Sequence, residues 1–476
     1  MNRMVVIFCA ACAAVALGGQ PTSESSGQQT PQSQPSTSEL TLTAQQRAMG
    51  LARVWSEVRY NYPMAHRLKG LDWDAQFQAR LAEVLPEQSD RDYYRRLQAL
   101  AALVRDSHVS VSPPQRLRRV GPPVRLWPVG GRFVVIAYGE GADPAGQLAI
   151  GDMVAAVDGV PVDTYAAQQI SPYVCATDSF RLTSTASALL AGEPGTRLTL
   201  DLIKPDKSAY TCTLIRDDAA GRWVSYEPLA RQTKVTGRRL GDGVGYISIG
   251  GFGSKSVVGG FDDQLRALGD IRALVIDLRV NGGGNSGYGD RIISRLIDKP
   301  IPNTIERRMS YLPALRSWGR GEKGSGRMWN DIRMEPCQPA DGGELRFSGP
   351  LAVLTSPSTA SAAEDFLAPL KGAGRAIVVG QPTSGSTGNP LMFDLPGGGQ
   401  LRVCTRYMLM PDGSEFIDVG IAPDIPVAPT AQDIAQGRDV VLEAAVAELG
   451  KRLAAPASST APADSATISN TSAAKE

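Results

Sequence analysis

A serine at the start of an apolar helix is the first residue in this chain that could do chemistry. Residues 351–354 are a short apolar run that predicts a buried strand, residues 355–358 interrupt it, and apolar spacing from Ser361 onward predicts a helix. A serine at such a sharp strand-to-helix turn stands clear of its own backbone, near the positive end of the helix dipole, which suits a nucleophile. Ser361 and Glu364 also match the Ser-x-x-Glu pattern of a capping box, so this stretch alone leaves both roles open.

A run of glycines follows another apolar strand. Residues 273–279 predict that strand, and Asn281 is followed by Gly282, Gly283 and Gly284. Glycines let backbone N–H groups point into a cleft, because no Cβ stands in the way. A nucleotide site is disfavoured, since no Lys-Ser/Thr pair follows the run and no acidic residue ends a strand about 20 residues further on.

Composition argues against two other kinds of site. The chain of 476 residues has only two histidines, His66 and His108, and its four cysteines beyond the N-terminal apolar run are widely and irregularly spaced. We therefore expect no metal site and no cofactor. Because 49 Lys and Arg residues balance 48 Asp and Glu residues, nucleic acid is not expected as a partner either.

The N-terminus predicts export. Residues 1–19 combine an early positive charge with a short apolar run, as a signal peptide does. The composition of residues 20–40 predicts a disordered linker, and that of residues 454–476 a disordered tail. No other run is long enough to span a membrane, so we expect a periplasmic or secreted protein. Export leaves open whether disulfides form among the four cysteines beyond the signal, which are Cys175, Cys212, Cys337 and Cys404.

Three units are predicted between these ends. Residues 41–112 predict a helical unit, which begins with a Thr43-x-x-Gln46 capping box. Residues 115–217 predict short strands whose Gly-Asp turn pattern resembles a PDZ domain, a module that binds an extended peptide at an open sheet edge. Residues 235–453 alternate strands with helices, which predicts an α/β core.

Four motifs of the third unit, taken in order, resemble those of the C-terminal processing peptidases and their tricorn-protease relatives. They are Asp277-Leu278-Arg279-x-Asn281-x-Gly283-Gly284, Ser358-Thr359-Ala360-Ser361-Ala362-Ala363-Glu364, Gly380-Gln381-Pro382-Thr383-x-Gly385 and Gly420-Ile421-x-Pro423-Asp424-Ile425. The resemblance extends over residues 42–427, because the helical and PDZ-like units match the same layout. It implies a crotonase-like ββα catalytic core with Ser361 as the nucleophile.

The two branches of that superfamily differ in the base. Processing peptidases pair the serine with a lysine, and the corresponding position here, 25 residues after Ser361, holds Ser386. Lys371 lies at the far end of the predicted Ser361 helix and is too distant to replace it. Tricorn-like members use a Ser-His pair upstream, which Ser107-His108 matches. The resemblance therefore implies that His108 accepts the Ser361 proton and returns it to the leaving amine.

The supporting groups follow from the same resemblance. A carboxylate should orient His108, and Glu415 is the preferred residue, with Asp418 as the competitor and Ser107 as the link. Backbone N–H groups of Gly283 or Gly284 and of Ala362 should form the oxyanion hole. Tricorn has an acidic residue after its catalytic serine that favours basic substrates. Ala362 stands at that position here, so we expect no such preference.

The sequence thus predicts an exported serine peptidase that hydrolyses peptide bonds through an acyl-enzyme on Ser361, with His108 as general base. Its expected substrate is a peptide or unfolded protein, and the sequence assigns no oligomeric state. A catalytically inactive relative that binds a ligand or peptide is one alternative, and an esterase that uses the same site is another. The mechanism requires His108 Nε2 within about 4 Å of Ser361 Oγ.

Overall fold

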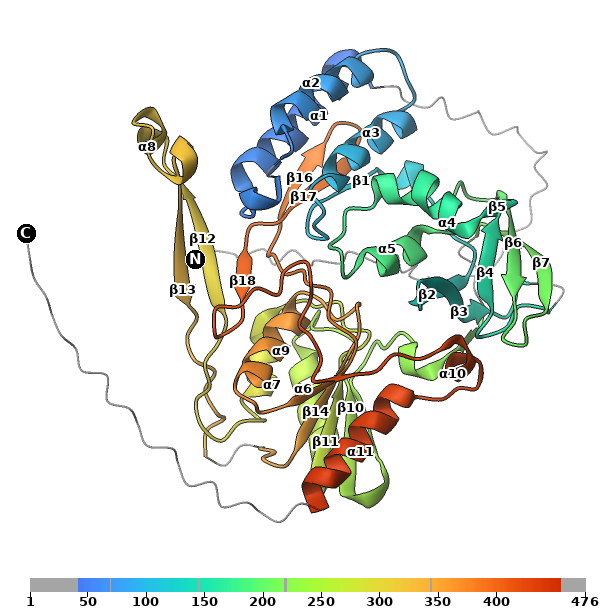
Figure 1. Cartoon of the computed structure of the whole chain (residues 1–476), viewed down its shortest axis with the longest axis vertical. Helices are drawn as coiled ribbons and strands as arrows, with labels where there is room; N and C mark the ends of the chain where they lie inside the picture. Colours follow the sequence, from blue (N-terminus) through green and yellow to red (C-terminus); the bar gives the residue numbers. More distant parts are fainter. Residues whose placement is uncertain (1–41, 69, 144–145, 218–220, 343–344, 455–476) are drawn as a thin grey trace, which may run out of the picture.

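The computed structural model describes residues 42–454 apart from residues 69, 144–145, 218–220 and 343–344 (Figure 1). The predicted signal peptide, the predicted linker and nearly all of the predicted tail lie outside the described residues. No helix within the described range is long and apolar enough to cross a lipid bilayer.

The N-terminal region is helical, as its apolar spacing predicts. It contains α1 (Ala44–Asn61), α2 (Trp73–Val84) and α3 (Asp90–Ala102), and the predicted capping box at Thr43 is confirmed. After α3, the short strand β1 (Ser110–Ser112) pairs with β17 (Gly399–Val403), which pairs in turn with β16 (Leu391–Leu395). The helices share one hydrophobic core with the C-terminal half of the chain, so position 112 ends an element without separating two cores.

A small antiparallel β unit with a core of its own follows. Leu198, Leu200 and Leu202 alternate along one of its strands, and all three side chains are buried. The elements of this unit are β2 (Val124–Val129), β3 (Arg132–Gly139), β4 (Met153–Val157), β5 (Val160–Pro161), α4 (Val162–Tyr165), α5 (Arg181–Ala188), β6 (Arg197–Ile203), β7 (Ala209–Ile215) and β8 (Trp223–Ser225).

The C-terminal half is built on a six-stranded sheet in the order β19-β15-β14-β11-β10-β9, parallel except for the edge strand β9. Its central strands are almost continuously apolar because both faces are covered (Figure 1). Leu274, Ile276 and Val353 pack under α6, α7 and α9, whereas Val275 and Leu354 pack against α11. The strands and helices are β9 (Thr236–Arg239), β10 (Val244–Ser248), α6 (Ser256–Leu268), β11 (Ala273–Asp277), α7 (Ser286–Ile293), β14 (Leu351–Thr355), α9 (Ala362–Gly372), β15 (Ile377–Gly380), β19 (Ile425–Pro426), α10 (Ala431–Ala435) and α11 (Val440–Ala454).

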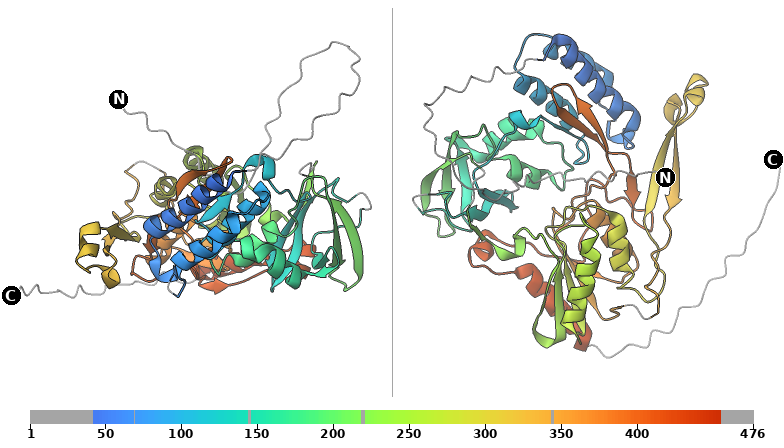
Figure 2. Two further views of the ribbon diagram at one scale, coloured as in Figure 1. Left: turned by 90° about the horizontal axis from the view of Figure 1, so that it is seen from above. Right: turned by 180° about the vertical axis from the view of Figure 1, so that it is seen from behind.

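A long hairpin projects from this half of the molecule (Figures 1 and 2). It consists of β12 (Ile305–Tyr311) and β13 (Arg327–Arg333), with α8 (Pro313–Ser317) at its tip. Strand β18 (Tyr407–Leu409) pairs with the base of β12 and anchors the hairpin to the core.

A buried ion network joins the central sheet to the last helix. The Arg279 guanidinium donates to Asp277 and to Asp439, with N···O distances between 2.6 and 3.1 Å, and the Arg279 side chain is only 4% exposed. Two residues of the Asp277-Leu278-Arg279 motif therefore have a visible structural role at the end of β11.

We predict that Arg279→Met lowers the free energy of unfolding by about 3–5 kcal/mol, because it leaves the Asp277 carboxylate buried without a cationic partner. Chemical denaturation monitored by circular dichroism measures this. Arg266→Met is the matched control, since Arg266 pairs with Asp263 on the exposed face of α6, where loss of a pair costs less than ~1 kcal/mol. Equal effects of the two substitutions would contradict the prediction.

Candidate active site

The candidate site lies beyond the carboxyl ends of three neighbouring parallel strands. The loop after β11 carries Gly283, the turn after β14 carries Ser361, and the loop after β15 carries Ser386. Parallel strands end at one edge of the sheet, so these segments converge although they are distant in sequence.

Ser361 occupies a backbone conformation that residues other than glycine rarely adopt, with φ of 58° and ψ of −124°. Its N–H lies 2.9 Å from the Ser386 carbonyl oxygen and 3.1 Å from Glu364 Oε2. Gly283 packs directly against the turn, where a Cβ would come within 2.7 Å of Ser361 Cβ. The Glu364 carboxylate contacts the Ser361 N–H as in the predicted capping box, and the Ser361 hydroxyl also faces His108.

His108 contacts both serines of the site. Its Nε2 lies 3.3 Å from Ser361 Oγ, within the distance the proposed chemistry requires, and its Nδ1 lies 2.6 Å from Ser386 Oγ. The residue sits in the turn between α3 and β1, and only 4% of it is exposed. The backbone N–H of His108 donates to Asp106 Oδ1 at 2.8 Å. Gly388 allows this packing, because a Cβ there would lie 2.9 Å from the imidazole ring.

Asp106 completes a polar chain behind the imidazole. Ser386 Oγ is 3.4 Å from Asp106 Oδ1, and the Tyr62 hydroxyl donates to Asp106 Oδ2 at 3.2 Å. An ionised carboxylate only accepts hydrogen bonds, so Ser386 donates to Asp106 and accepts from His108 Nδ1–H. That assignment leaves Nε2 as the acceptor that faces the Ser361 hydroxyl.

Burial controls the charge of this chain. It lowers the pKa of His108 well below the usual 6.5, and the nearby Arg402 guanidinium lowers that pKa further. Burial raises the pKa of Asp106, against the opposing effects of the hydrogen bond from the His108 backbone and of the Arg67 charge. His108 is therefore neutral at neutral pH, as a proton acceptor must be.

The structure does not bring the other predicted orienting groups to His108. The Glu415 carboxylate is 56% exposed and lies 3.6 Å from Arg307, in a segment that bridges to Leu409. Asp418 accepts from Arg67 at 2.7 Å and from the Asp178 N–H at 2.8 Å. The Ser107 side chain makes no hydrogen bond to any other described residue.

Ser386 and Asp106 occupy the place expected for Glu415 and Ser107. The sequence showed Ser386 at the lysine position of the processing peptidases, but that position by itself assigned no role. Asp106 stands two residues before His108, and this proximity was the only sequence signal for it. Lys371 pairs with Asp424 at the far end of α9, as its distance from Ser361 along the helix requires.

Of the predicted oxyanion donors, one is already engaged. The Gly283 N–H donates to Asn281 Oδ1 at 2.9 Å. The N–H groups of Gly284 and Ala362 donate to no acceptor in the described part of the chain, and Ala362 follows Ser361 at the first position of α9. These two groups remain candidates for binding a developing oxyanion.

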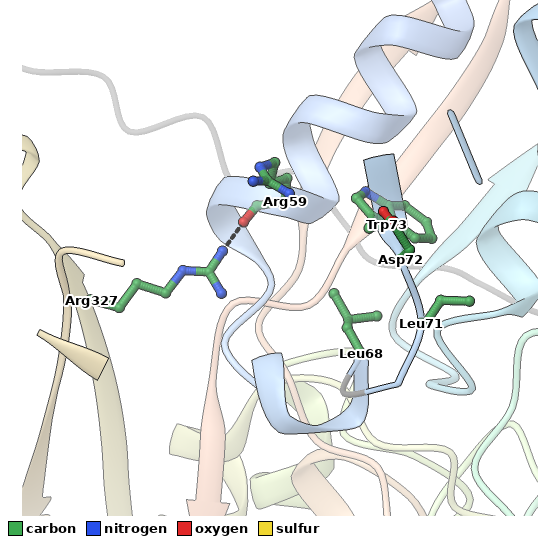
Figure 3. Close-up of a pocket in the computed structure, with 6 residues that line it drawn as sticks. All are labelled: Arg59, Leu68, Leu71, Asp72, Trp73 and Arg327. Atoms are coloured by element: carbon green, nitrogen blue, oxygen red, sulfur yellow. Dashed lines mark hydrogen bonds between the residues drawn. The ribbon is translucent and has the colours of Figure 1, made fainter. Parts of the chain in front are cut away.

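A separate cavity of about 260 Å³ lies between the helical region and the hairpin (Figure 3). Its polar side chains already have partners. Arg59 pairs with Asp74, Asp72 accepts from the Ala75 N–H, and Arg327 donates to the Arg59 carbonyl oxygen. No residue of the Ser361 site lines it, and it carries no nucleophile. The lining residues are Arg59, Leu68, Leu71, Asp72, Trp73 and Arg327.

The four cysteines whose pairing the sequence left open are all free thiols, three of them buried. They are Cys175, Cys212, Cys337 and Cys404.

Comparison with known proteins matches part of this chain to one family. Residues 243–427 match Peptidase family S41. The chain is 25% identical over 397 residues to carboxyl-terminal-processing peptidase 3, chloroplastic, of Arabidopsis thaliana, a match that covers 79% of this chain and 68% of that protein. It is also 25% identical over 386 residues to the chloroplastic C-terminal processing peptidase of Tetradesmus obliquus, covering 76% and 74% of the two chains.

A solved structure agrees at the level of fold. The crystal structure of mature CPAF superposes with a TM-score of 0.69 at 16% identity, over 87% of this chain and 99% of that one. Together with the sequence matches, the site defines a serine-type peptidase. Residues 243–427 are similar to peptidase family S41, and the chain is similar over most of its length to C-terminal processing peptidases.

We predict that the acid limb of kcat/KM that reports His108 lies below pH 6.5, because burial and Arg402 lower the pKa of the imidazole. Arg402→Gln should move the acid limb to higher pH, since it removes a charge that lowers this pKa. A pH–rate profile of both proteins measures the shift, with Arg452→Gln on α11 as control. An acid limb that moves to lower pH in Arg402→Gln would refute the electrostatic argument.

Proposed function

We propose that this protein is an exported serine peptidase that hydrolyses peptide bonds through an acyl-enzyme on Ser361, with His108 as general base. One observation carries the proposal: a single buried imidazole lies within hydrogen-bonding reach of Ser361 Oγ on one side and of Ser386 Oγ on the other. A serine hydroxyl is a weak nucleophile without a base, and His108 supplies one.

The reaction follows from the polarity of this chain. His108 Nε2 takes the Ser361 proton as Oγ attacks the substrate carbonyl carbon, and the Gly284 and Ala362 N–H groups bind the oxyanion. The tetrahedral intermediate collapses, the C–N bond breaks, and the imidazolium gives its proton to the leaving amine. Water, deprotonated by His108, then attacks the acyl-enzyme and releases the new carboxyl terminus and free Ser361.

Ser386 and Asp106 take the orienting role that the sequence assigned to Ser107 and Glu415. They hold the imidazole through Nδ1 and stabilise the imidazolium that forms when Ser361 is deprotonated. The contacts of 2.6 and 3.4 Å along the chain support this assignment. Ser386 is short enough to leave room for the imidazole where a processing peptidase places its lysine.

The wider functional proposals rest on the sequence and on the relatives. The signal-like residues 1–19 support export to the periplasm or the exterior. The names of the relatives, which process carboxyl termini, support a peptide or protein substrate. A PDZ-like role for the small β unit would present an extended peptide to a crotonase-like catalytic core.

Labelling with a fluorophosphonate probe tests the mechanism. Ser361→Ala should abolish labelling, and His108→Ala should slow it by about 10³-fold or more, because each removes a member of the reacting pair. Ser386→Ala should slow it at least ~10-fold through loss of imidazole orientation. Glu415→Gln should label at close to the wild-type rate.

Mass-spectrometric mapping of the adduct and the initial rates of labelling are the measurements. Fast labelling of Ser386→Ala combined with slow labelling of Glu415→Gln would reverse the assignment of the orienting residue. A wild-type protein that is not labelled at all would favour an inactive binding relative. Labelling with turnover of short acyl esters but not of casein would favour an esterase.

A further inference from the structure

The Glu364 carboxylate is the most heavily hydrogen-bonded side chain near the site. It is fully buried, with 0% exposure, and it accepts four hydrogen bonds. Oε1 accepts from Thr383 Oγ1 at 2.5 Å and from the Gly385 N–H at 2.7 Å. Oε2 accepts from the Ser386 N–H at 3.0 Å and from the Ser361 N–H at 3.1 Å.

These four bonds reach beyond what a helix cap needs. A cap requires only the contact between Glu364 and the Ser361 N–H, which lies in the same helix start. The other three donors belong to the loop that follows β15, and that loop carries Ser386, whose hydroxyl contacts His108 Nδ1. One carboxylate oxygen thus holds the backbone of the nucleophile and the backbone of the residue that orients the base.

We infer that Glu364 is a positioning residue for the peptidase reaction: its carboxylate fixes the distance between Ser361 and the Ser386–His108 pair. This inference rests on the proposed function, because it assumes that Ser361 and His108 react. Glu364 itself contacts neither the substrate nor a reacting atom. A displacement of about 1 Å between catalytic groups can reduce a rate by up to about 100-fold, so such a role has a measurable consequence.

The donors also define the charge state that the role requires. Three of the four are backbone N–H groups, which cannot accept, and Thr383 Oγ1 already accepts from the Ile421 N–H at 2.7 Å. An ionised carboxylate satisfies all four donors, whereas a protonated acid or an amide sets a donor against a donor. The positive end of the α9 dipole stabilises the negative charge.

Burial opposes that charge. It raises the pKa of Glu364 to about 8, even though all four hydrogen bonds act to lower it. The ionisable groups nearest to it along the network are His108 and Asp106, both reached through Ser386, while the neighbouring Asp365 accepts from Ser286. We therefore expect kcat to rise with pH through about 8 as Glu364 ionises, on a limb separate from that of His108.

The experiment compares Glu364→Gln with wild type and with Glu443→Gln, a control on α11 far from the site. In Glu364→Gln, the new amide NH₂ group must face the Gly385 N–H in one orientation and the N–H groups of Ser361 and Ser386 in the other. The readouts are the rate of fluorophosphonate labelling, kcat and KM with fluorescent casein, and the pH dependence of kcat. We expect kcat to fall at least about tenfold with KM within about threefold, and the limb near pH 8 to disappear.

A second pair of variants removes dependence on the folding of Glu364→Gln. Thr383→Val deletes one donor and should lower kcat, and Thr383→Ser restores the hydroxyl and should restore the rate. Thermal unfolding shows whether each variant is folded.

The outcomes separate the two proposals. If Glu364→Gln folds, a wild-type kcat and an unchanged pH limb would overturn the inference. If it does not fold, equal rates for Thr383→Val and Thr383→Ser would overturn the inference. In both cases the wild-type protein would still be labelled at Ser361. A wild-type protein that is not labelled would instead refute the proposed function, and the inference with it.

Discussion

The site depends on a strained backbone turn. Ser361 has a positive φ, a conformation that costs a residue with a side chain of order 1–3 kcal/mol unless its surroundings impose it. Here the surroundings do so, because Gly283 leaves space against the turn and the Ser361 N–H is shared by the Ser386 carbonyl oxygen and Glu364. The conformation aims the hydroxyl at His108 and leaves the Ala362 N–H pointing out of the helix start. The positions of the proposed nucleophile, base and oxyanion donors therefore depend on this one constraint.

The loop after β15 transmits that constraint to the other regions of the molecule. From the small β unit, Thr177 Oγ1 donates to the Ser384 carbonyl oxygen at 2.5 Å. From the core, the Asp418 N–H donates to the Gly385 carbonyl oxygen at 2.8 Å, and the Asp418 carboxylate binds Arg67 of the helical region. All three regions are thus linked to this one loop. A relative movement between them would displace Ser386, which contacts His108.

Sequence alone predicted the parts of this arrangement that local patterns encode. The strand before Ser361, the helix after it and the capped helix at Thr43 follow from apolar spacing and turn chemistry, and the Ser361–His108 pair follows from a family resemblance. The partner of His108 Nδ1 could not be predicted in this way, because it depends on how a loop 278 residues away in sequence packs against the imidazole. Glu415 had a plausible spacing, but Arg307 and the bridge to Leu409 hold it elsewhere. The hairpin of residues 305–333 escaped prediction because neither strand buries a face of alternating apolar residues, so the period-two pattern is absent.

The pairing of β1 with β17 has a consequence for the life of the chain before it is fully folded. It joins the strand next to His108 to one that ends at Val403, almost three hundred residues later. During synthesis His108 emerges first, Ser361 much later, and the strand that pairs beside His108 after both. The order of the segments therefore delays the assembly of the proposed site until the chain has been made as far as Val403.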